Sequence, residues 1–138
     1  MKLNTLHTLQ AIIAFLFGLG FMVMPVFVLS IIGLSTSADG LLVTRLFGVL
    51  IFSICILAIK AKAISDAKAK NTILTFLVTA HILLLLFCLG AQLIYKMGNF
   101  MLWGTDIYHL LFAIGYGSFL FKGDESTEIS SVGVEGRV

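Results

Sequence analysis

Charged side chains are scarce in this sequence. Only 12% of its 138 residues are Asp, Glu, Lys or Arg, whereas 59% are hydrophobic, and the mean hydropathy is +1.10. A small water-soluble domain exposes a large fraction of its residues and needs more charge than this. The composition therefore excludes a soluble domain and predicts an all-α integral membrane protein that contacts the lipid bilayer. It also excludes a nucleic-acid partner, because the net charge is only +2 and the cations lie in predicted loops.

Cysteine and proline are nearly absent as well. The two cysteines, Cys55 and Cys88, lie inside apolar runs and have neither the CxxC spacing of a redox pair nor the clustering of a zinc site. We therefore expect packed thiols, no metal and no other cofactor. The single proline, Pro25, lies within the first apolar run and removes a backbone donor, which predicts a kink there. A functional hinge at Pro25 is the alternative interpretation.

Four long hydrophobic runs dominate the chain. A helix needs about 20 residues to cross roughly 30 Å of hydrocarbon. The runs cover residues 8–33, 41–61, 72–94 and 101–121, and short polar segments separate them. Because short connections make consecutive helices antiparallel neighbours, residues 1–121 are predicted to form an antiparallel bundle of four transmembrane helices. Residues 122–138 are rich in Ser, Gly and acidic side chains and are expected to form a mobile cytoplasmic tail.

The cations divide unequally between the two ends of the predicted bundle. One end holds Lys2, Lys60, Lys62, Lys68, Lys70 and Lys122. At or near the other end of the spans lie Arg45 and Lys96. Short loops rich in Lys and Arg are retained in the cytoplasm, so both termini are predicted to be cytoplasmic.

Small and polar residues follow one face of each predicted span, and the polar ones are Gln10, Arg45, His81, Gln92, Asp106 and His109. Their spacing of three and four residues keeps them on one side of a helix. In a bilayer such residues mark contacts between helices, because lipid tails pack against Leu as well as another Leu does. The residues expected to pack helix against helix are Ala14, Gly18, Gly48, Ala113 and Gly117. Four such faces imply one shared interior.

A set of glycine and aromatic motifs runs along the hydrophobic chain. They are Gly18-Leu19-Gly20 before Pro25, then Gly33-Leu34, Arg45-Leu46-Phe47-Gly48, Gly98-Asn99, Trp103, and Gly115-Tyr116-Gly117 before Phe119 and Phe121. In this pattern the chain resembles a large group of small bacterial four-helix inner-membrane proteins that have no established activity. The resemblance implies a four-helix fold and a bacterial inner-membrane location, and it implies no function. Asp106 and His109 do not match positions of that pattern.

Polar residues inside the spans are the candidates for a functional site, because a charge near the bilayer centre costs at least about 2.5–3.5 kcal/mol. By position, Arg45, Gln92 and Asp106 lie at similar depth near the outer surface, and His109 lies one turn deeper. Three interpretations are open. Arg45 reaches the headgroups while Asp106 is solvated; Arg45 and Asp106 form a structural ion pair; or the four residues form a proton or ligand site.

Two histidines invite comparison with a haem protein, since two imidazoles from facing helices can bind iron axially. The predicted boundaries separate His81 from His109 by about 8 Å along the membrane normal, at about 1.5 Å per residue. Axial ligands lie nearly level, so haem is not expected. The spans also show no catalytic constellation, which argues against an enzyme.

Two classes of function are consistent with these features. The first is a non-enzymatic structural or accessory membrane module that packs as a homo-oligomer or within a larger membrane complex. The alternative is a transporter-like or small-ligand-binding bundle in which Arg45, Gln92, Asp106 and His109 line a site near the outer surface. An enzyme acting on a lipid or quinone has only the isolated histidines in its favour.

Overall fold

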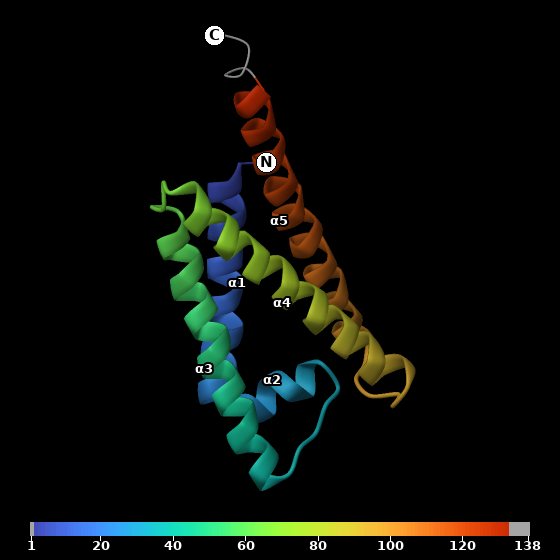
Figure 1. Cartoon of the computed structure of the whole chain (residues 1–138). Coiled ribbons are helices and arrows are strands. Elements are labelled where there is room, and N and C mark those ends of the chain that lie inside the picture. Colours follow the sequence, from blue (N-terminus) through green and yellow to red (C-terminus); the bar gives the residue numbers. More distant parts are fainter. Residues whose placement is uncertain (1, 133–138) are drawn as a thin grey trace.

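Five helices make up the part of the chain that the structure, a computed structural model, describes. It describes the backbone of residues 2–132 and the side chains of residues 2–121. The helices are α1 (Leu3–Val23), α2 (Pro25–Ile31), α3 (Ala38–Ala61), α4 (Ala67–Leu93) and α5 (Phe100–Val132) (Figure 1). The predicted tail, residues 122–138, has no described side chains and lies beyond the described backbone from residue 133 on. Its mobility stays a prediction.

Three of these helices are long and apolar enough to cross a membrane, within the residues that the structure describes. They are α1, α3 and α4. Lipid contact follows from their length and composition. Helix α5 contains the fourth expected span, 101–121, but it does not belong to this set. Asp106 and His109 interrupt its apolar sequence.

The first expected span, 8–33, is two helices rather than one. Helix α1 ends at Val23, and Met24 leaves the helical region with φ −128° and ψ 53°. Pro25 then begins α2 at a position where its missing N–H costs nothing. Figure 1 shows α2 running at a steep angle to α1. The helix is therefore interrupted before this proline, and the chain does not form one kinked helix.

Small residues allow α1 and α3 to lie in close antiparallel contact. A Cβ atom added at Gly18 would lie 2.7 Å from the backbone nitrogen of Phe52, and one added at Gly48 would lie 2.8 Å from that of Met22. Neither position has room for a side chain without movement of the opposite backbone. Nearby, a buried cluster of small side chains continues this contact toward the start of α1, and its members are Ala11, Ala14, Cys55 and Ala58.

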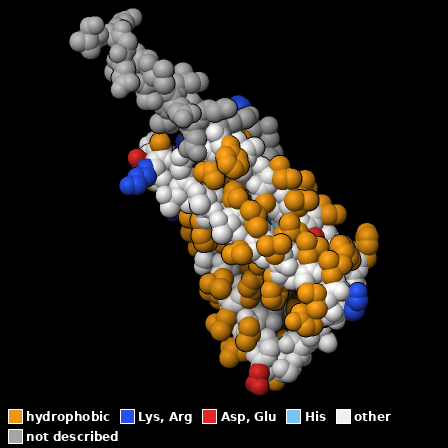
Figure 2. All heavy atoms as spheres, turned by 45° about the vertical axis from the view of Figure 1, so that its right-hand side comes forward, with side chains coloured by type: hydrophobic (Ala, Val, Ile, Leu, Met, Phe, Trp, Pro, Cys, Tyr) orange, Lys and Arg blue, Asp and Glu red, His pale blue; other side chains and the backbone are white. Residues whose placement is uncertain are grey.

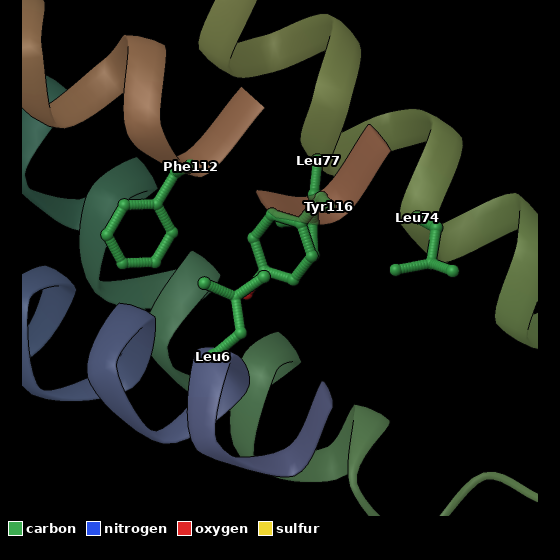
Figure 3. Close-up of a cluster of buried hydrophobic side chains, with 5 residues drawn as sticks. All are labelled: Leu6, Leu74, Leu77, Phe112 and Tyr116. Atoms are coloured by element: carbon green, nitrogen blue, oxygen red, sulfur yellow. The ribbon is translucent and has the colours of Figure 1, made fainter. Parts of the chain in front are cut away.

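A second helix pair, α4 with α5, packs against α1 through a buried cluster of larger side chains. Figure 3 shows Leu6 of α1 pointing toward Tyr116 of α5, with Leu74 and Leu77 of α4 beside them. Phe112 of α5 completes the cluster. The bundle therefore consists of two antiparallel helix pairs, α1 with α3 and α4 with α5, joined mainly where α1 meets α4 and α5.

The surface around these helices is apolar. Figure 2 shows hydrophobic side chains spread over one face, with few charged side chains among them. On the four long helices Leu16, Leu50, Leu83 and Leu111 are each between 61% and 63% exposed. Apolar exposure of this extent fits a protein surrounded by lipid rather than water.

Asn99 connects the end of α2 to the start of α5, at the end of the bundle that holds the α4–α5 turn. Its backbone N–H donates to Ile32 O at 3.0 Å, and its side-chain Nδ2 donates to Ile31 O at 3.0 Å. Its Oδ1 accepts from the backbone N–H of Met101 at 2.8 Å and so caps the start of α5. One side chain therefore fixes both the end of α2 and the beginning of α5.

Candidate functional site

A hydrogen-bonded network of polar side chains lies in the interior where α1, α4 and α5 meet. Gln10 of α1 accepts through Oε1 from Tyr108 OH of α5 at 3.1 Å, and the same oxygen lies 2.9 Å from His81 Nε2 of α4. His81 Nδ1 in turn lies 2.9 Å from His109 Nδ1 of α5. Gln10 and His81 are buried, with 3% and 5% of their surface exposed. We call these four residues, Gln10, His81, Tyr108 and His109, the interior network.

The geometry of the interior network assigns a proton to each bond. Gln10 Oε1 can only accept, so His81 Nε2 carries the hydrogen of that bond. A neutral His81 then has its Nδ1 free to accept, and the proton between the two imidazoles belongs to His109 Nδ1. With both imidazoles neutral, every bond of the network has one donor and one acceptor.

Aromatic rings surround the imidazole of His81. Phe112 stacks on it with ring centroids 5.3 Å apart and an interplanar angle of 28°. Tyr108 meets it edge-on, at 5.5 Å and 76°. These contacts exclude water from the ring faces and hold the imidazole in the plane that its two hydrogen bonds require.

A further pair extends the polar contact between α1 and α5. His7 Nδ1 lies 3.2 Å from the hydroxyl of Tyr116, and the two rings are 5.3 Å apart. Tyr116 is fully buried and His7 is 2% exposed. All three histidines of the chain therefore lie in hydrogen-bonded contacts between helices.

Gln92 of α4 and Asp106 of α5 form a second, separate polar pair. Gln92 Nε2 donates to Asp106 Oδ2 at 2.5 Å and also contacts Cys88 O at 3.3 Å. Both side chains are buried, with 7% and 6% of their surface exposed. The other two oxygens of the pair, Gln92 Oε1 and Asp106 Oδ1, are buried without a hydrogen-bond partner.

The structure divides the four residues of the predicted polar cluster among three places. Gln92 and Asp106 are joined to each other, and His109 bonds to His81 in the interior network. Arg45 is exposed on α3. The described residues contain no ion pair between Arg45 and Asp106, because one carboxylate oxygen bonds to Gln92 and the other has no partner.

The residues expected at helix contacts are also divided. Ala14, Gly18 and Gly48 lie where α1 meets α3. On α5, Ala113 is half-buried and Gly117 is buried. A Cβ added at Gly117 would first meet the ring of Phe121 of the same helix, at 4.0 Å.

The depth expected from sequence for the two histidines of the interior network was wrong. Their rings lie 5.2 Å apart and touch through Nδ1, although the sequence predicted about 8 Å of separation along the membrane normal. Position in sequence gives depth only for helices that stand upright in the membrane, and α4 runs obliquely across the bundle (Figure 1). This oblique course of α4 brings the two rings into contact.

No group of three or more His, Cys, Asp or Glu side chains is placed to hold a metal ion within the described residues. The arrangement can instead hold protons in fixed positions and join three helices through directional bonds. No protein-family model matches the sequence, and no curated protein or solved structure matches it either.

Proposed function

We propose that the protein is a non-enzymatic membrane module whose four long helices cross the bilayer, and that its interior network joins the two helix pairs. The observation that carries this proposal is that the polar groups of the network bond to one another across α1, α4 and α5. Such an interior serves to fix the arrangement of the helices. The role that follows is structural or accessory, as a homo-oligomer or as part of a larger membrane complex.

The energetics of buried hydrogen bonds support this role. A buried donor or acceptor that loses its partner costs about 1–3 kcal/mol. In the interior network a shift of α1 relative to α4 and α5 would break the bonds from Gln10 to both His81 and Tyr108. The network therefore opposes sliding between the two helix pairs, which packing of Leu against Leu in lipid opposes only weakly.

Helix α5 is the fourth crossing in this proposal. It is antiparallel to α4, and its polar side chains turn toward the interior: Asp106 and Tyr116 are buried, and Tyr108 and His109 are half-buried. Leu111 and Ile114, on the outer surface, are each 62% exposed. Helices in lipid place ionisable residues toward the bundle in this way.

The location and orientation form part of the same proposal. The short loop between α3 and α4 and the helix ends beside it hold Lys60, Lys62, Lys68 and Lys70, and this excess of lysine favours a cytoplasmic position for that loop and for both chain ends. The resemblance to small bacterial proteins favours the bacterial inner membrane.

Native mass spectrometry of the protein, extracted from its own membrane in a mild detergent, tests the proposed role. A structural or accessory module should appear as a homo-oligomer or in a complex of fixed stoichiometry. A monomer that carries one small molecule per chain would contradict this proposal.

One observation favours the alternative of a transporter-like or small-ligand-binding bundle. Gln92 Oε1 and Asp106 Oδ1 are buried acceptors that no donor of the described residues satisfies. In the mass-spectrometry experiment the alternative predicts a bound small molecule that is lost in Gln92→Leu. The matched control is Gln10→Leu, which alters the interior network instead.

A further inference from the structure

The pair formed by Gln92 and Asp106 has a specific deficit in its hydrogen bonds. A carboxamide and a carboxyl group that face each other can form two bonds, in which each group donates once and accepts once. The structure contains one of them, from Gln92 Nε2 to Asp106 Oδ2. The two atoms that would make the other bond, Gln92 Oε1 and Asp106 Oδ1, are the two that have no partner.

An ionised Asp106 cannot repair this deficit. A carboxylate has no hydrogen to donate, so its Oδ1 and the carbonyl oxygen of Gln92 would both remain buried acceptors without a donor. The negative charge would also stay buried with a single hydrogen bond, because no cation pairs with it in the described residues. One added proton removes both costs.

We propose that Asp106 and Gln92 form a proton-binding site between α4 and α5. Asp106 takes up one proton on Oδ1 and donates it in a hydrogen bond to Gln92 Oε1, while Gln92 Nε2 continues to donate to Oδ2. The pair is then neutral, and its two side chains satisfy each other. The inference does not depend on the proposed structural role, because both side chains are already buried within a single copy of the chain.

Other titratable groups lie near this site on both helices. Cys88 precedes Gln92 by one turn of α4, and its thiol lies close to Asp106 and Thr105. His109 follows Asp106 by one turn of α5 and bonds to His81. A thiol carries no positive charge in either of its forms, and His109 is neutral in the proton arrangement given above, so neither replaces the proton. Arg45 of α3 is exposed.

Infrared spectroscopy of protein labelled with ¹³C-aspartate tests the proposal directly. An ester-free detergent is needed, since lipid ester carbonyls absorb near protonated carboxyl groups. At neutral pH the folded protein should show the carbonyl band of a protonated aspartic acid, and the band should disappear as the pH is raised. Asp106→Asn should lack the band, whereas the matched variant Asp39→Asn, at an exposed position in the first turn of α3, should retain it. Gln92→Leu should move the band to higher frequency, because the carboxyl loses its partner.

Two results would overturn the proposal. The first is the absence of a protonated aspartic acid band from the folded wild-type protein at neutral pH, a result that needs no variant to fold. The second is stabilisation of the wild-type protein by sodium chloride but not by choline chloride, with no such effect in Asp106→Asn, because that would identify a bound metal cation instead of a proton.

Discussion

Gln10 is the residue on which the interior network depends most. Its single Oε1 accepts from Tyr108 and His81, which belong to two different helices. Gln10→Leu should therefore leave two donors without an acceptor and lower the free energy of unfolding by about 2–6 kcal/mol, at about 1–3 kcal/mol for each donor. Unfolding by sodium dodecyl sulfate in mixed micelles measures this loss. Leu9→Ala, at the exposed neighbouring position, is the control and should change little.

A double-mutant cycle at the same residue checks that the loss arises from the network. Tyr108→Phe removes one of the donors that Gln10→Leu leaves without an acceptor. The double variant should be less destabilised than the two single losses combined, by about 0.5–3 kcal/mol. Additive losses would show that the hydroxyl of Tyr108 does not bond to Gln10.

At the residue scale the sequence predicted which types of residue turn inward better than it predicted their partners. Gln10, His81, Gln92 and Asp106 lie on the small and polar faces of their helices and are buried, whereas Arg45, on the corresponding face of α3, is exposed. Which groups become their hydrogen-bond partners depends on how far each helix tilts and where it ends. The spacing of residues along the sequence predicts neither of these. For this reason the sequence paired Asp106 with Arg45 in one interpretation, whereas the structure joins it to Gln92.

At the scale of the elements, contact between α1 and α3 depends on two glycines. Gly18→Ala should destabilise the protein by about 1–3 kcal/mol, because the added methyl group meets the backbone of Phe52 at 2.7 Å. Gly90→Ala in α4 is the matched control, since nothing lies within 4 Å of its added Cβ. Alanine favours a helix over glycine by roughly 0.5–1 kcal/mol, so this control should be neutral or stabilising. Equal thermal shifts for the two variants would contradict the assigned contact.

Asn99 is the corresponding residue at the junction of α2 with α5. Asn99→Ala removes the cap of α5 and one bond to Ile31, and loss of a cap alone costs about 0.5–2 kcal/mol. The Asn99→Ala variant should therefore melt in detergent at a lower temperature than the Ser35→Ala variant, which changes an exposed serine in the segment between α2 and α3. No difference between the two variants would show that the junction does not contribute to stability.

Helix boundaries were the least predictable feature of the elements. Pro25 predicted a kink in a single helix over residues 8–33, whereas the structure has two helices that are separated at Met24. A proline in a membrane helix is compatible with a kink as well as with a break. Which one occurs depends on where the following segment finds packing partners, and here α2 packs Val28 against Gly20 of α1.

For the whole molecule, composition alone indicated a helical membrane protein, because scarce charge and long apolar runs leave few other folds. Three helices of the described chain meet the requirement for crossing a membrane. The proposed function depends most on α5 being the fourth crossing. It rests on the way α5 packs along α4 with its polar residues turned inward.

Cysteine labelling in spheroplasts tests this claim most directly. The background is the variant with Cys55→Ala and Cys88→Ala, and single cysteines are placed at Ser37, Ser65, Met97 and Ser126. If all four long helices cross, an impermeant thiol reagent should label positions 37 and 97 in intact spheroplasts and positions 65 and 126 only after lysis. Labelling of position 126 together with 97 before lysis would show that α5 does not cross, and labelling of 65 and 126 alone would show the opposite orientation.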